Sequence, residues 1–286
     1  MSLSATFRLV VLLGLLTALF LAVGYYFAGT AGMTMALGAA LFMNALAYWF
    51  SDSFVLRMYG AKKMDAKSKE YKELNPILER LAKKAGIPKP PVYLVRTDVP
   101  NAFATGRSQQ HAAVAVTKGL LETLSNKEIE GVLAHELSHV KHRDTLVATM
   151  AATLAGALTW IGYSFFFGND ENRSIFSYML LFILAPLAAT LIQLSITRSR
   201  EYLADRGGAQ IANPLDLASA LEKISASVKA APAQGNAAGA HLFIVNPFSA
   251  SALSSLFSTH PPVEQRVQRL REMAKHSKAV EKKDAQ

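Results

Sequence analysis

Four long stretches of this chain carry no charged side chain, and they constrain its fold more than any other feature. They cover residues 9–28, 31–50, 145–167 and 175–197 of 286. Each approaches or exceeds the roughly twenty apolar residues that a helix needs to cross a bilayer. The first stretch is long for a secretory signal, lacks a clear cleavage site and is followed almost at once by the second. The pattern predicts a mainly α, polytopic membrane protein with four transmembrane helices.

Lysine and arginine residues near these stretches predict the orientation of the chain. Several follow the second and fourth stretches and Arg8 precedes the first, whereas the short loop of residues 168–174 is acidic on balance. Because basic residues accumulate on the cytoplasmic side, both termini and the central segment are expected there. This bias accounts for the net charge of +9. We expect no nucleic-acid partner, since no basic motif interleaved with aromatic residues is present.

The central segment contains the string His135-Glu136-Leu137-Ser138-His139. A capping-box pattern at Ser125 and Glu128 and a helically spaced apolar stripe place this string on a helix. Residues four apart share one face, so His135 and His139 can reach the same metal ion. Glu136 can then address a water in an open coordination position. Cysteine is absent, so His and carboxylate must hold the metal.

A third metal ligand is expected just beyond the fourth stretch. His139 lies about six residues before the third stretch and Glu201 about four residues after the fourth, roughly 9 Å and 6 Å above the membrane. Because antiparallel neighbours emerge side by side, Glu201 can meet the metal, and Asp205 can accept an N–H from a ligand imidazole. Two alternatives stay open. The carboxylates can pair with nearby arginines, or His142 or Asp144 can be the ligand, although helical rise puts His142 about 4.5 Å beyond His139.

Short apolar runs at residues 92–95, 102–105 and 112–116 predict a small sheet before the metal helix. An exposed sheet edge beside such a metal site can accept an extended peptide as an added strand. The candidate substrate-binding residues at this edge are Asn101, Ala102, Phe103 and Ala104. The alternative is an ordinary buried strand with Phe103 in the core.

Further helices are predicted from their end signals. Asn75 and Pro76 predict the start of one helix and Gly86 its end, and Asn213-Pro214 opens another. A final amphipathic helix follows residues 260–262. The metal helix is expected to continue through Asp144 into the third apolar stretch.

The motifs and their order resemble HtpX, the family of bacterial membrane zinc metalloproteases related to the endoplasmic-reticulum protease that trims prenylated C-termini. The residues that carry the resemblance are His135–His139, the Glu201-x-x-x-Asp205 pair, Asn101–Ala104 and Ser258-Thr259-His260-Pro261-Pro262. It covers nearly the whole chain. It implies one Zn²⁺ per subunit on His135, His139 and Glu201, with Glu136 as the base. It also favours His260 as a donor to the oxyanion, over a mere helix-start residue.

The resulting interpretation is a gluzincin-like endopeptidase of the bacterial cytoplasmic (inner) membrane. Transmembrane hairpins are expected in residues 1–52 and 145–197, and a zincin-like cytoplasmic domain in residues 53–144 and 198–286. The resemblance implies quality control, with misfolded or damaged membrane and cytoplasmic proteins as substrates and self-cleavage as a possibility. The alternatives are a processing enzyme for a lipidated C-terminus, a scaffold or chaperone with a structural metal, and a transporter. No charge within the stretches marks an ion path.

Overall fold

The computed structural model of this protein describes residues 21, 23–39, 42, 49, 55–144, 147, 196–230, 243–245 and 261–284, with side chains as far as residue 276. The chain separates into two compact units, Met1–Phe50 with Leu146–Ser199 and Ser51–Thr145 with Arg200–Gln286. In the described parts, no helix combines the length and the apolar character that crossing a membrane requires. The four apolar stretches lie mostly outside these residues, so the transmembrane helices and the domain limits stay predictions.

The second unit contains a small mixed sheet. Its strands lie in the order β1 (Lys62–Lys63), β2 (Val92–Val95), β4 (Ala112–Thr117) and β3 (Ala102–Gly106). β2 and β4 are parallel, whereas β1 pairs with β2 and β3 pairs with β4 in antiparallel fashion. The three strands predicted from sequence are confirmed, and the two-residue β1 was not foreseen. Among the described strands β3 pairs only with β4, so it lies at an edge of the sheet.

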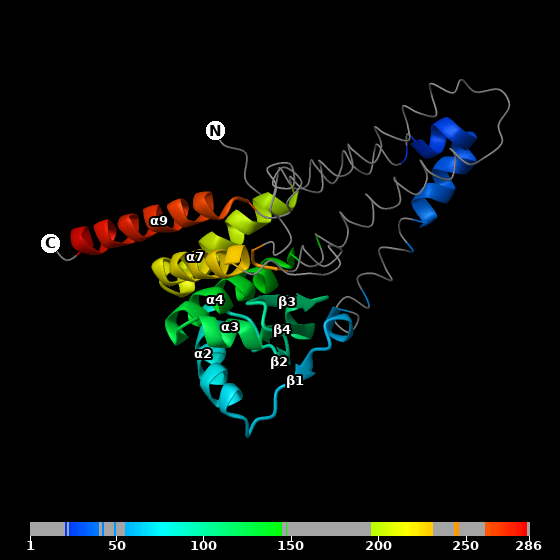
Figure 1. Cartoon of the computed structure of the whole chain (residues 1–286). Coiled ribbons are helices and arrows are strands. Elements are labelled where there is room, and N and C mark those ends of the chain that lie inside the picture. Colours follow the sequence, from blue (N-terminus) through cyan, green and yellow to red (C-terminus); the bar gives the residue numbers. More distant parts are fainter. Residues whose placement is uncertain are drawn as a thin grey trace. The chain divides into compact units, whose positions relative to one another are not determined.

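Helices make up most of the second unit, which confirms the mainly α prediction. They are α2 (Lys69–Ala85), α3 (Lys118–Thr123), α4 (Asn126–His142), α7 (Pro214–Ala230) and α9 (Val263–Asp284), with a 3₁₀ turn, η1, at Gln109–His111. Residues 196–211 are also helical. Within this unit, α4 packs on β3 and α2 on one side and on α7 on the other, and α9 covers the far side of α7 (Figure 1). Helix α4, which carries the two predicted histidine ligands, is therefore packed between the sheet and α2 on one side and α7 on the other.

Helix α2 begins earlier than its sequence signals suggest. Its N-cap is Ser68, whose side chain accepts the N–H of Tyr71, and Pro76 lies inside the helix. The predicted start at Asn75 and Pro76 is wrong because the apolar face already includes Leu74, which is buried with the rest of that face. Burial on both sides of the proline stabilises the helix across it. The predicted stop at Gly86 is confirmed, with φ 71° in the left-handed region that glycine tolerates.

Helix α4 is fixed at its N-terminus by the predicted capping box. Ser125 N–H donates to Glu128 Oε2 over 2.8 Å. On α7, Ser219 and Lys223 also donate to the Glu128 carboxylate. Burial works against ionisation of Glu128, but these donors hold its pKa at about 2. At Gly131 the helices come so close that an added Cβ would lie 2.6 Å from the Leu217 backbone nitrogen, which explains the missing side chain.

The C-terminus of α4 differs from the prediction. The helix ends at His142, and Arg143 takes a left-handed conformation with φ 56°, its N–H directed at the carbonyls of His139 and Val140. The prediction of one continuous helix through Asp144 is wrong. Left-handed caps of this kind satisfy carbonyls that the last turn leaves open. The chain direction changes at Arg143, and this change determines where Asp144 lies.

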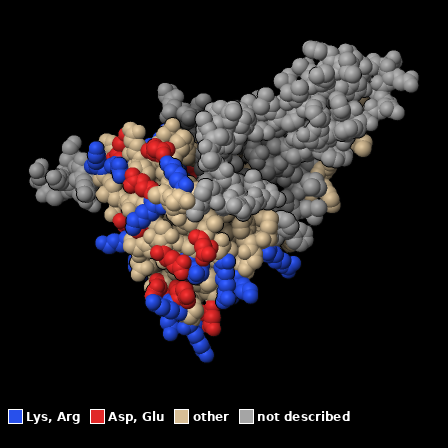
Figure 2. Space-filling model, in the orientation of Figure 1, with Lys and Arg blue, Asp and Glu red and all other residues tan. Residues whose placement is uncertain are grey.

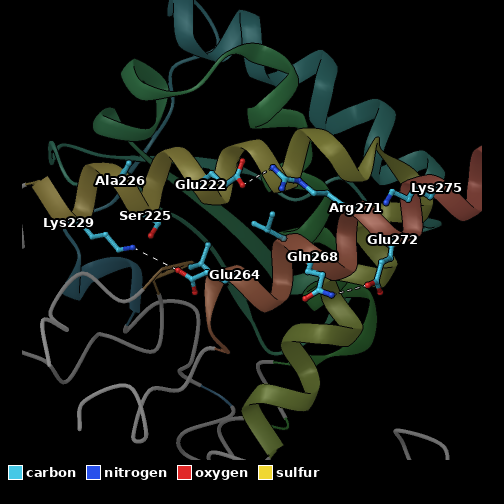
Figure 3. Close-up of a pocket in the computed structure, with 11 residues that line it drawn as sticks. Glu222, Ser225, Ala226, Lys229, Glu264, Gln268, Arg271, Glu272 and Lys275 are labelled. Carbon is cyan, nitrogen blue, oxygen red and sulfur yellow. Dashed lines mark hydrogen bonds and ion pairs between the residues drawn. The ribbon is translucent and has the colours of Figure 1, made fainter. Parts of the chain in front are cut away.

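Charges of both signs are interspersed on the face of the second unit that Figure 2 shows. A groove of about 620 Å³ lies between α7 and α9. Figure 3 shows that ion pairs join its two walls, Arg271 with Glu222 at 2.9 Å and Lys229 with Glu264 at 3.9 Å. None of the predicted site residues lines this groove. The predicted metal ligands and the predicted base therefore lie outside this groove.

Candidate metal centre

Two histidines of α4 and a glutamate of the helical residues 196–211 converge in the second unit. The Nε2 atoms of His135 and His139 lie 3.0 Å apart. Glu201 Oε1 is 3.4 Å from His139 Nε2, and Oε2 is 3.8 Å from His135 Nε2. One potential ligand atom from each of the three residues lies within 4.8 Å of the others. Two imidazoles and one carboxylate form a typical donor set for a catalytic metal ion.

The outer nitrogen of each imidazole is engaged by a carboxylate. His135 Nδ1 lies 3.0 Å from Asp205 Oδ1, and His139 Nδ1 lies 2.7 Å from Asp144 Oδ2. A carboxylate at Nδ1 favours the tautomer with its proton there, which leaves the lone pair on Nε2 for a metal. Two such lone pairs that face each other at 3.0 Å repel unless a cation binds both. The residues present therefore fit a metal ion.

The protonation of the two imidazoles agrees with this fit. Burial lowers the pKa of His135 to about 4, so its ring is neutral at pH 7, as a ligand must be. Burial also opposes protonation of His139, but the Glu201 carboxylate outweighs it and raises the pKa of this ring above the ordinary value. The same negative charge that attracts a proton to His139 favours a bound metal cation.

Glu136 lies between the metal cluster and the sheet. Its Oε2 accepts the N–H of Ala104, on β3, over 2.8 Å. Burial, with Glu201 acting in the same direction and His139 opposing, raises the pKa of Glu136 to about 7. A carboxylate with a pKa near neutrality can both accept and return a proton at physiological pH.

The four predicted substrate-binding residues lie at the start of β3, and the last of them, Ala104, contacts this carboxylate. Asn101 is buried, its Oδ1 accepts the N–H of Ile244, and its own N–H donates to Thr117. Phe103 is also buried and packs against Tyr59, with ring centroids 5.2 Å apart. β3 is thus an edge strand with a buried phenylalanine, so the two interpretations drawn from sequence are compatible.

Arg266 of α9 is a site residue that the sequence analysis missed. It is fully buried. Its Nη2 and Nε donate to Asp205 over 2.7 and 2.9 Å, and its Nη1 lies 3.2 Å from Glu201 Oε2. Burial alone would raise the pKa of Asp205, but Arg266 and His135 outweigh it and hold that pKa at about 2. One guanidinium therefore orients both carboxylates of the helix that faces α4.

Two further histidines, His142 and His260, were candidates for the site. His142 is not part of the metal cluster; its Nδ1 lies 3.2 Å from the Ser138 hydroxyl. The alternative of His142 as third ligand is therefore not supported by the geometry. His260 lies outside the described residues, so its role stays a prediction.

Comparisons with known proteins agree with this geometry. The model of Peptidase family M48 matches residues 68–274, which include all of the cluster. The chain belongs to peptidase family M48. A protease HtpX homolog of Pyrococcus abyssi is 52% identical over 96% of this chain and 98% of the relative. One from Salinibacter ruber is 49% identical over 94% of this chain and 98% of the relative. The resemblance to the HtpX family is confirmed, and the chain is a metalloprotease.

A solved structure supports the M48 fold. The crystal structure of S. mikatae Ste24p aligns with a TM-score of 0.55 and 20% identity over 90% of this chain and 62% of that longer one. The shared fold is mainly helical with a small sheet.

Proposed function

We propose that this M48 chain is a zinc-dependent endopeptidase in which His135, His139 and Glu201 hold one Zn²⁺ per subunit. The observation that carries the proposal is the convergence of two Nε2 atoms, 3.0 Å apart, on the Glu201 carboxylate, with Glu136 buried beside them. Two imidazoles and a carboxylate suit Zn²⁺. When bound, the ion supplies Lewis-acid chemistry that polarises the scissile carbonyl and acidifies a water.

The residues of the chain perform the proton transfers and the orientation. Glu136 takes a proton from the attacking water and then returns it to the leaving amine, which needs a pKa near the working pH. Asp205, clamped by Arg266, keeps the proton of His135 on Nδ1. His260 is proposed as the donor to the oxyanion of the tetrahedral intermediate.

No other described strand pairs with the outer edge of β3, and this edge provides a place for an extended substrate. The N–H of Ala104 reaches Glu136, so it faces away from β4. Alternate residues of an antiparallel strand face the same way, so Ala102 and Gly106 also present their backbone groups outward. A peptide that pairs with this edge brings its scissile bond beside Ala104 and therefore beside Glu136. Backbone pairing explains how such an enzyme accepts many sequences.

Strand addition is tested on the substrate rather than on the enzyme. In a set of peptides with one N-methylated amide each, kcat/KM should fall at alternate positions on each side of the cleaved bond. Each lost hydrogen bond, at about 1 kcal/mol, corresponds to roughly five-fold. Losses without a period of two would contradict pairing with β3, and a uniform loss at all positions would do the same.

The membrane part of the proposal relies on the four uncharged stretches and on the family. Residues 1–52 and 145–197 are proposed as two transmembrane hairpins in the bacterial inner membrane, with the active site and both termini in the cytoplasm. Alkaline carbonate washing should leave the chain in the membrane pellet, and release into the supernatant would contradict the spans. Damaged or misassembled proteins, including those of the membrane, are the proposed substrates, and copies of the chain itself are included.

Metal removal is the test of the enzyme. Protein purified in detergent should contain one zinc per chain and digest casein. Dialysis against a chelator should abolish digestion, because no side chain at the cluster can replace the Lewis-acid chemistry of the ion, and stoichiometric Zn²⁺ should restore it. Full digestion by protein shown to be metal-free would overturn the assignment. Mapping the cleaved bonds separates the two protease classes, because quality control predicts many sites and a processing enzyme predicts one.

A further inference from the structure

The second metal-site histidine has a carboxylate partner of its own, which the sequence did not suggest. His139 Nδ1 lies 2.7 Å from Asp144 Oδ2, and Asp144 is 5% exposed. The pair is closer than the Nδ1–carboxylate pair of His135 and Asp205, at 3.0 Å. Each imidazole of the cluster therefore has one carboxylate behind it.

An arginine stands behind this carboxylate as well. Asp144 Oδ1 forms an ion pair with Arg200 Nη2, and the same Nη2 donates to the His142 carbonyl over 2.9 Å. Arg200 directly precedes Glu201, so successive residues of one helix approach opposite ends of the His139 ring. Glu201 lies at Nε2, and Arg200 acts at Nδ1 through Asp144.

The left-handed residue at the end of α4 makes this contact possible. In a continuous helix, a residue five positions on lies about 7.5 Å further along the axis and about 140° round it. From there Asp144 would not reach the outer nitrogen of His139. Because Arg143 turns the chain with φ 56°, Asp144 folds back beside the last turn. Non-glycine residues rarely adopt this conformation, and here it serves the contact with the metal-site histidine.

The contact also lies at a special place in the chain. The chain leaves the second unit after Thr145 and returns to it at Arg200. Asp144 is next to the last residue before the chain leaves this unit, and Arg200 is the first residue after it returns. Their ion pair therefore joins the two ends of the unit's two segments. It fixes these two points at the metal cluster.

The geometry points to Arg200–Asp144–His139 as a positioning relay that presents His139 Nε2 to the metal, with Asp144 as its central residue. The inference rests on the proposed function, because it assumes that the cluster binds a metal. Asp144 touches neither substrate nor metal ligand atoms and acts through the orientation and tautomer of His139. Carboxylates in this position typically contribute 10- to 100-fold to metal affinity.

The test compares metal binding by full-length wild type, Asp144→Asn, Asp144→Ala and Arg200→Gln in detergent. Zn²⁺ affinity, measured by competition with a chromophoric chelator, should fall about 10- to 100-fold in Asp144→Ala and less in Asp144→Asn. The absorption bands of the Co²⁺ form should shift, because they report the ligand field. The Asp144→Asn, Arg200→Gln double variant should lose no more affinity than the stronger single variant, as expected for residues that act as one unit.

Glu128→Gln is the matched control. Glu128 lies at the other end of α4, and its side chain is 7% exposed, as is that of Asp144. Its loss should lower the unfolding midpoint but leave Zn²⁺ affinity and the Co²⁺ spectrum unchanged. Wild-type affinity and spectrum in folded Asp144→Asn and Asp144→Ala would overturn the relay, as would additive losses in the double variant. If wild type itself binds no metal, the proposed function fails.

Discussion

Glu136→Gln is expected to lower kcat/KM for casein-type substrates by roughly 10²–10⁴-fold, the usual contribution of a general base, while zinc content stays at one per chain. Glutamine has nearly the same shape, and its amide oxygen can still accept the Ala104 N–H that now reaches Glu136 over 2.8 Å. It cannot take a proton from water. The measurements are steady-state proteolysis and metal analysis on the same preparation.

The control for this variant is again Glu128→Gln, since both glutamates are buried residues of α4 and only Glu136 adjoins the metal cluster. Proteolysis should be retained in this control.

Burial raises the pKa of Glu136 to about 7, and a bound cation would lower it. Because the base must be ionised, wild-type kcat/KM should rise with pH along a limb at or below pH 7. If Glu136→Gln had wild-type kcat/KM, or the same rise of kcat/KM with pH to the wild-type plateau, Glu136 would not be the base.

Sequence patterns predicted those parts of the fold whose determinants are local. The capping box of Ser125 and Glu128 fixes the start of α4, and Gly86 ends α2, because each satisfies backbone groups within a few residues. The three main strands follow from short apolar runs. Two of the cluster residues come from helical spacing, which is local as well. At Pro76 the local signal for a helix start was wrong, because burial of the apolar face, which includes Leu74, extends the helix to residues before the proline.

The position of Glu201 was predicted correctly, although part of the structure assumed in that prediction was wrong. It was expected near the histidines because two neighbouring helices were thought to emerge at one level, one of them continuous with α4. The structure places Glu201 at the cluster, yet α4 ends at His142. The order of the elements was sufficient for this inference. The left-handed turn at Arg143 was not foreseeable, since arginine carries no preference for positive φ. The contact of Asp144 with His139 was missed with it.

Arg266 was missed because charged residues on an amphipathic helix are usually exposed. One signal was present, however. Residues three and four apart share a helical face, and Arg266 lies three after Val263 and four before Leu270, within the apolar stripe. Its carboxylate partners come from residues 61 and 65 positions earlier in the chain, a distance at which a single sequence gives no pairing information.

The largest loss of stability is expected from Arg266→Gln. Its guanidinium, 0% exposed, faces two buried carboxylates, Asp205 at 2.7 Å and Glu201 at 3.2 Å. Removal of one partner of a buried ion pair typically costs about 3–5 kcal/mol, because the remaining charge is left without compensation. The free energy of unfolding, from denaturant titration of chelated protein at pH 7, should fall by about this amount. Arg266→Lys should lose less, since it keeps the charge but not the fork that contacts Asp205 twice.

The pH dependence separates lost charge compensation from lost packing. In wild type the pKa of Asp205 is held at about 2, so its contribution is present above the unfolded value and is lost only as pH falls through about 2. Without Arg266 the buried carboxylates of Asp205 and Glu201 lose their compensating charge, so their ionisation destabilises the fold and their protonation removes this cost. The difference in unfolding free energy between Arg266→Gln and wild type should therefore shrink as pH falls from 7 toward 4. Arg271 lies on the same helix as Arg266 and forms an exposed pair with Glu222 of α7, so Arg271→Gln should change stability little. A difference for Arg266→Gln that is constant with pH would show that packing alone is lost, and the guanidinium would then have no electrostatic role at the cluster.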